Sequence, residues 1–171
     1  MFVVLPRQFG KTIGAVSRYL WAYNFGTTNS EIMFMHLDHS RAKGNLKTLK
    51  TFRDILPSYL RMDSNVNAEG KKLKVPNTVV TIQNPFNNNR IVTFPSARTK
   101  DSADGLARGC TQPIQWYDEF GFINYNDTVY SAAVPAFSTA SQNAKRNGAP
   151  YGICLTTTPG DLLTEIGRAH V

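Results

Sequence analysis

Three short segments of the chain carry residue types that bind phosphate and activate water. The first, residues 6–12, ends in Gly10-Lys11-Thr12 and lies between an apolar run and a helical pattern. Backbone N–H groups at a helix start attract anions, such a lysine reaches the β- and γ-phosphates, and the threonine hydroxyl binds Mg²⁺. The segment therefore predicts a phosphate-binding loop, although Leu5 stands where the general motif has its first glycine.

The same loop carries two residues that are unusual in a phosphate-binding segment. Arg7 and Gln8 add charge and hydrogen bonds at the phosphates in this interpretation, and in the simpler one they are solvated. The simpler alternative for the whole segment is a turn with a solvated lysine. The strand-loop-helix context favours the phosphate interpretation.

Two adjacent carboxylates, Asp118 and Glu119, follow the mostly apolar run 113–117. In a phosphate-loop fold, an Asp at such a strand end holds Mg²⁺ through water, and the next Glu polarises the attacking water. Carboxylates at an exposed strand end are the simpler alternative. Together with the Lys11 loop, the pair predicts a nucleotide-hydrolysing site. Gln115 interrupts the apolar run, whereas buried parallel strands are normally continuous in their hydrophobicity.

The third segment, Thr156-Thr157-Thr158-Pro159-Gly160, places three hydroxyls at a strand end ahead of two residues that interrupt regular structure. It is either an exposed turn or a sensor of the γ-phosphate that couples the state of the nucleotide to movement.

Apolar runs bounded by turn residues alternate with helical patterns, which is typical of an α/β sheet. Asp38 or Ser40 is expected to cap the second helix, and Pro57 to end it. The run 84–89 joins two β-branched runs as a hairpin, and the basic stretch 58–76 is expected on the surface. The expected strands are 2–5, 31–37, 78–83, 90–94, 113–117 and 151–155, and the expected helices are 12–24, the segment before Pro57, and 127–141 despite Pro135.

Composition narrows the class of protein. The 171 residues suit one globular domain, and 19 Lys+Arg against 12 Asp+Glu give a net charge of +7, which favours a polyanionic partner. No apolar run is long enough to predict a membrane span. Cys110 and Cys154 are too far apart for a zinc finger or a disulfide framework, so a reducing cytoplasm is the natural setting.

In this order along the chain, the segments 7–12, 117–120 and 155–160 resemble those of the ATPase domain of the large terminase subunit of tailed bacteriophages. The phosphate loop of that family also lacks the first glycine, so Leu5 fits the family. The stretch 107–109 resembles a family element whose arginine acts across a subunit boundary. The resemblance covers about residues 2–160.

The resemblance implies an α/β fold with a mainly parallel sheet flanked by helices, a P-loop NTPase core of the ASCE or RecA-like type, and a β-hairpin insertion. It implies ATP and Mg²⁺ as cofactors, with Glu119 activating water, Arg7 acting at the γ-phosphate in cis and Arg108 acting in trans. The implied nucleotide-binding residues are Arg7, Gln8, Phe9, Gly10, Lys11, Thr12, Asp118, Thr156 and Thr157, and Thr12 and Asp118 would hold Mg²⁺.

The resemblance also implies a part of a larger protein. Residues 1–163 are expected to form a partial ATPase domain, without the nuclease domain of the family. Residues 164–171 match one reading frame of a common sequencing adapter and are expected to be a non-native tail. The implied partners are double-stranded DNA, the portal protein and procapsid, the small terminase subunit and further copies in a ring, in the host cytoplasm and without a membrane.

Two other functions share some of these features. A helicase-type ATPase would carry the same loop and acidic pair, and a non-catalytic nucleic-acid-binding or scaffold module would need neither. A GTPase is disfavoured because no N-K-x-D motif occurs. Lys43, Lys47 and Lys50 share one helical face, which is either solvated or tracks a DNA backbone. His36 and His39 lack a third ligand in sequence, which disfavours a metal site there.

Overall fold

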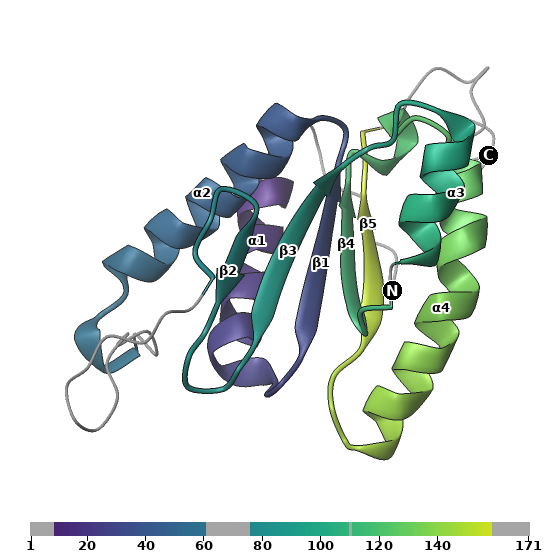
Figure 1. Ribbon diagram of the computed structural model, residues 1–171. Helices are drawn as coiled ribbons and strands as arrows, with labels where there is room; N and C mark the ends of the chain where they lie inside the picture. Colours follow the sequence, from purple (N-terminus) through teal and green to yellow (C-terminus); the bar gives the residue numbers. More distant parts are fainter. Residues whose placement is uncertain (1–8, 61–75, 110, 159–171) are drawn as a thin grey trace.

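The computed structural model describes residues 9–60, 76–109 and 111–158, and within them five strands form one sheet (Figure 1). The strand order is β2-β3-β1-β4-β5, and every neighbouring pair is parallel except β2 and β3. The predicted α/β class, parallel sheet and hairpin are confirmed. The strands are β1 (Glu31–His36), β2 (Thr81–Gln83), β3 (Arg90–Pro95), β4 (Ile114–Asp118) and β5 (Gly152–Thr156).

Helices cover both faces of the sheet (Figure 1). The pair α1 (Lys11–Trp21) and α2 (His39–Ile55) lies on one face, and α3 (Lys100–Arg108) and α4 (Asn126–Arg146) lie on the other. A π-helical turn, 22–26, extends α1, and short 3₁₀ turns occupy 58–60 and 120–122. None of the helices in the described ranges is long and apolar enough to cross a membrane.

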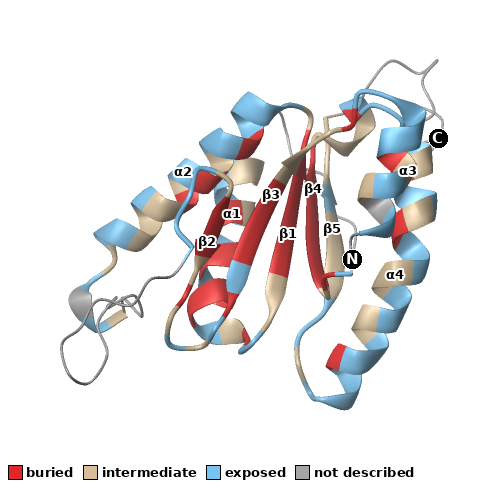
Figure 2. Cartoon of the chain, in the orientation of Figure 1, coloured by how far each residue is buried: buried red, intermediate tan, exposed pale blue. Residues whose placement is uncertain are grey.

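The core consists of two clusters, one on each side of the sheet. Phe34 and Trp116 point to the α1 and α2 side, whereas Met35 and Tyr117 point to the α3 and α4 side. Strands buried on both faces need continuous apolar runs, and the central strands are the most buried part of the chain (Figure 2). Gln115 is tolerated there because its amide donates to the Gln112 carbonyl at 3.0 Å and its oxygen accepts from the Tyr117 hydroxyl at 2.8 Å.

Most of the predicted elements are present. Asp38 caps α2 by accepting from the Arg41 amide at 2.8 Å, and α2 ends two residues before Pro57. Helix α4 continues through Pro135 to Arg146, further than expected. Helix α3 was not predicted, because its sequence is largely polar and shows a helical apolar stripe of only a few residues. The expected strand 2–5, most of the excursion 58–76 and the tail 164–171 lie outside the described residues.

A buried asparagine fastens the end of α1 to the hairpin. The Asn89 side chain is fully buried, and its amide donates to the carbonyls of Tyr23 at 2.9 Å and Thr27 at 2.6 Å. Its oxygen accepts from the Ser30 amide at 3.1 Å. These bonds satisfy backbone groups that the irregular turn between α1 and β1 leaves without partners, and so they set where β1 enters the sheet.

Replacing Asn89 with alanine would remove the partner of the Thr27 carbonyl and of the Ser30 N–H, whereas the Tyr23 carbonyl would keep the Asn87 amide at 2.9 Å. Since each unsatisfied buried group costs about 1–3 kcal/mol, we expect Asn89→Ala to lower the free energy of unfolding by about 2 kcal/mol or more in urea titrations. Asn143→Ala, at an exposed position on α4, should change it by less than about 0.5 kcal/mol. Equal changes in the two variants would contradict the role of Asn89.

Candidate functional site

The candidate site lies at the carboxyl ends of β1, β4 and β5, beside the start of α1. Parallel strands end at the same edge of a sheet, so His36 of β1, Asp118 of β4 and Thr156 of β5 come together. Gly10 precedes α1 in the left-handed region, with φ of 78°. No side chain of the described residues caps this helix start, and the N–H groups and positive dipole end of a helix attract anions.

Lys11 connects the phosphate loop to the end of β5. Its Nζ donates to the Thr157 carbonyl at 2.8 Å, between residues 146 positions apart. Thr12 follows half-buried, and its hydroxyl makes no hydrogen bond with another described residue. Phe9, the first described residue, is 67% exposed. Arg7 and Gln8 lie outside the described residues.

Asp118 is buried, and both of its carboxylate oxygens are hydrogen-bonded. Oδ1 accepts from the Thr156 hydroxyl at 2.8 Å, and Oδ2 accepts from the Asn45 amide of α2 at 3.0 Å. His36 Nδ1 lies 3.7 Å from Oδ2. The Thr156 hydroxyl itself accepts from Trp116 Nε1 at 2.9 Å, so it is held on both sides. The orientation of Asp118 is therefore set by three separate elements.

These contacts decide the charge of Asp118. Burial by itself pushes the pKa of the carboxyl upward, but the contacts with His36, Thr156 and Asn45 outweigh burial and bring it below its ordinary value of 3.8. Asp118 is thus an ionised carboxylate at neutral pH, held in place and able to bind a cation.

Glu119 occupies a strained position directly after the strand. Its φ of 52° is in the left-handed region, which is uncommon for a residue other than glycine. Its Oε2 accepts from both the amide and the hydroxyl of Thr158, at 3.2 and 2.8 Å. Each of the three consecutive threonines thus contacts a different candidate residue: Thr156 contacts Asp118, Thr157 contacts Lys11 and Thr158 contacts Glu119.

Arg108 lies apart from this cluster, in the last turn of α3. Its Nε donates to Asp104 Oδ2 at 2.7 Å, which raises the pKa of the guanidinium, and its side chain is 73% exposed. It lines an open groove between α3 and α4 together with Asp127 and Ser131. The structure does not bring Arg108 to Lys11 or Asp118 of its own chain.

Sequence reasoning missed three residues of the cluster. The sequence indicates Thr158 only as part of the threonine run, and His36 only as a candidate metal ligand. The motifs assign no role to Asn45, although it is a polar residue three positions after buried Ala42, on the apolar side of α2. A polar residue on an apolar stripe is the signal that could have identified it.

The residues present suit a magnesium ion that is held partly by water and phosphate. They do not suit a metal ion that is held by protein side chains alone. No group of three or more His, Cys, Asp or Glu side chains in the described ranges could hold a metal. Mg²⁺ keeps several waters and is usually held by one or two carboxylates together with substrate phosphates. The ionised Asp118 and the hydroxyl of Thr12 suit that mode of binding.

No protein-family model and no curated protein sequence matches this chain. Among solved structures, the chain is similar to the Thermus phage P74-26 large terminase ATPase domain, with 16% sequence identity and a TM-score of 0.50. The similarity covers 90% of this chain but 57% of that one, so this chain spans little more than half of its length. At this identity the similarity concerns the fold, and it confirms the P-loop ATPase-like architecture that the resemblance implied.

The contacts of Asp118 should make the stability of the fold depend on pH. Because its pKa is below 3.8 in the folded chain, the ionised carboxylate stabilises the folded state above that pH, and the contribution is lost as the pH falls through the lowered pKa. We expect the difference in unfolding free energy between the unaltered chain and Asp118→Asn to stay constant from about pH 7 to 5 and to shrink below about pH 4. Urea titrations in EDTA measure it, and a difference that persists at low pH would contradict the lowered pKa.

Proposed function

We propose that this chain is the ATP-hydrolysing motor domain of a viral terminase large subunit, which drives double-stranded DNA into the procapsid. The observation that carries the proposal is the threonine run 156–158, whose members contact Lys11, Asp118 and Glu119. A phosphate-loop lysine, a metal-binding Asp and a candidate general base are thereby connected through one strand end. The similarity in fold to a terminase ATPase domain supports the same function.

Nucleotide binding would use the start of α1. The backbone N–H groups after Gly10 and the Lys11 ammonium would neutralise the phosphates, and Thr12 and Asp118 would hold Mg²⁺. The ion would supply further charge neutralisation on the β- and γ-phosphates. Lys11 now donates to the Thr157 carbonyl, so a bound phosphate would take over this lysine and release that carbonyl. Binding of the phosphate would therefore directly change a contact at the end of β5.

Hydrolysis would need Glu119 to orient and activate a water molecule in line with the γ-phosphorus. Two hydrogen bonds from Thr158 now hold its carboxylate. A shift of the β5 end when Lys11 leaves Thr157 would change those bonds, which is a physical route from phosphate binding to the general base. The same strand end would pass the state of the nucleotide to the rest of the motor.

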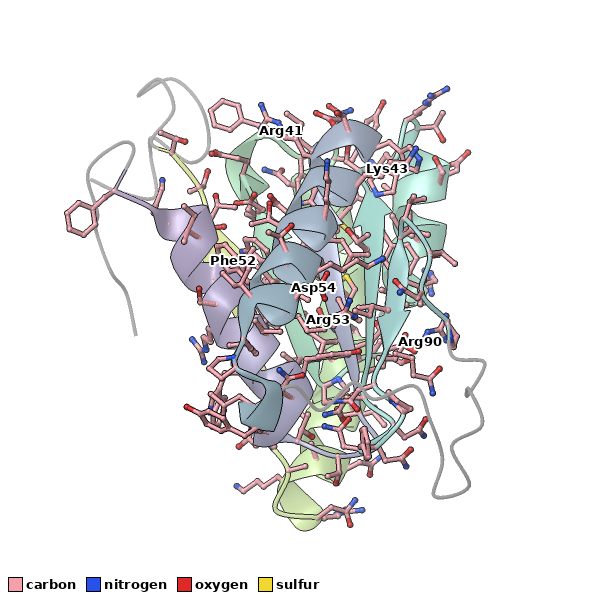
Figure 3. All side chains as sticks on the ribbon, turned by 90° about the vertical axis from the view of Figure 1, so that its left-hand side faces the viewer. Arg41, Lys43, Phe52, Arg53, Asp54 and Arg90 are labelled. Atoms are coloured by element: carbon pink, nitrogen blue, oxygen red, sulfur yellow. The ribbon has the colours of Figure 1, made fainter. Side chains whose placement is uncertain are left out.

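A basic surface on α2 supports a nucleic acid as the partner. This helix carries five basic residues and one acidic residue, and Figure 3 views it from the outside. Lys43 and Lys47 are exposed, and neither forms an ion pair within the described residues. The basic residues of α2 are Arg41, Lys43, Lys47, Lys50 and Arg53.

The remaining assignments extend the proposal to the assembled motor. It would work in the host cytoplasm as a homo-oligomeric ring on the portal protein of the procapsid, with the small terminase subunit as a further partner. Arg108 is exposed and distant from the site of its own chain, as a residue acting on a neighbouring subunit would be. Arg7 stays the candidate for action in cis. A helicase-type ATPase is the second candidate, because it would use the same Lys11, Asp118 and Glu119.

Two substitutions separate hydrolysis from binding. Glu119→Gln removes the group that activates water but leaves the phosphate cradle, so we expect Mg-ATP binding within about threefold of the unaltered protein and at least a hundredfold loss of ATP turnover. Lys11→Ala should weaken both binding and turnover. Nucleotide titrations and steady-state phosphate release measure the two quantities. Near-normal turnover in Glu119→Gln, or no binding of Mg-ATP by the unaltered protein, would contradict the proposal.

The salt dependence of DNA binding tests the surface on α2. Each phosphate contact contributes about −0.9 to the slope of log K against log salt concentration, so Lys43→Gln combined with Lys47→Gln should reduce the slope for double-stranded DNA by about 2. The control is Lys145→Gln combined with Arg146→Gln, which removes two exposed cations from α4. Equal slopes for both double variants would show that α2 does not contact the DNA.

A further inference from the structure

Asn45 is the contact between α2 and the buried carboxylate of the site. Its Nδ2 lies 3.0 Å from Asp118 Oδ2 and 3.2 Å from His36 Nδ1. Neither the phosphate-loop pattern nor the acidic pair requires a residue at this position, and nothing in the proposed reaction assigns Asn45 a role.

The chemistry of its neighbours fixes the orientation of the Asn45 amide. An ionised carboxylate only accepts hydrogen bonds, so the NH₂ group and not the oxygen must face Asp118. The same NH₂ group lies 3.2 Å from His36 Nδ1, so the amide also contacts the histidine ring. The Asn45 amide therefore contacts both Asp118 and His36.

The His36 ring provides a rigid support behind Asn45. It is fully buried, and it packs edge-on against Phe34 and Trp116, with ring centroids 6.2 and 5.4 Å apart. Its Nε2 is buried without a hydrogen-bond partner among the described residues. A ring held by this packing cannot turn toward a better partner, so it holds the Asn45 amide against Asp118.

The consequence concerns the lone pairs of Asp118. A carboxylate has about four acceptor positions. The Thr156 hydroxyl uses one on Oδ1, and the Asn45 amide uses one on Oδ2. Because both oxygens are hydrogen-bonded, the carboxylate of Asp118 cannot rotate. Its unused acceptor positions therefore keep one direction, in which a hydrated cation would be bound.

We propose that Asn45 is a positioning residue that orients Asp118 for Mg²⁺ bound together with the nucleotide. This rests on the proposed function, because it assumes that Asp118 is the metal-binding carboxylate. Asn45 touches neither nucleotide nor metal in this proposal. It acts through Asp118, so its loss should weaken the response to Mg²⁺ and leave the metal-independent affinity for the nucleotide unchanged.

The experiment compares Asn45→Ala and Asn45→Leu with Thr48→Ala. Leucine has the same branching and number of side-chain heavy atoms as asparagine and favours the helix, so it fills the same position on α2 if the alanine variant does not fold. Thr48 lies on the same helix and donates only to the Gly44 carbonyl within α2, so it controls for general effects on the helix. Binding of a fluorescent ATP analogue is titrated with Mg²⁺, and separately in EDTA.

Loss of an outer partner of a metal ligand typically costs 10- to 100-fold in metal affinity. We therefore expect both Asn45 variants to need at least about tenfold more Mg²⁺ for half-maximal binding of the ATP analogue. Their binding of the analogue in EDTA should be unchanged, and Thr48→Ala should bind it like the unaltered protein under both conditions. An unchanged Mg²⁺ requirement, or equal weakening with and without Mg²⁺, would overturn the role of Asn45 alone. If the unaltered protein binds the analogue without any dependence on Mg²⁺, the proposed function fails and this inference fails with it.

Discussion

The burial of one charged carboxylate organises the carboxyl edge of this sheet. Asp118 is 7% exposed, and a charge removed from water is tolerated only where other groups replace its lost hydration. Thr156 of β5, Asn45 of α2 and His36 of β1 replace it. Because these residues are far apart in sequence, the site exists only once β1, β4, β5 and α2 have assembled. The stability of the fold and the geometry of the site therefore depend on the same contacts.

A second polar cluster serves the opposite end of the sheet in a different way. Asn89 is neutral and bonds to backbone groups, so it fixes the path of the chain between α1 and β1. The cluster around Asp118 bonds side chain to side chain and leaves lone pairs unused. A fully satisfied network makes a rigid joint, whereas one with spare acceptors can take up a ligand. This difference distinguishes the two ends of the sheet.

The sequence was sufficient for the parts of the site that depend on local pattern. Lys11 after a glycine at a helix start, and Asp118 at the end of an apolar strand, are recognisable without knowledge of the fold, and the fold itself follows from alternating apolar runs. Asn45 could not be assigned, because its role depends on which strand lies beside α2. Helix α3 was missed because only a few of its residues, such as Ala103, contact the core. Long-range packing, not local propensity, decides these cases.

Helix α2 has the geometry of a lever. Its 17 residues span about 25 Å at 1.5 Å per residue. Asn45, in the second turn of this helix, donates to the buried carboxylate of Asp118. Lys43 and Lys47 project from nearly the opposite side, since successive residues of a helix are turned by about 100°. A displacement of the outer side of α2 would be transmitted through Asn45 to Asp118 over a single helical turn. The exposed side of α2 and the buried carboxylate are therefore coupled through one rigid helix.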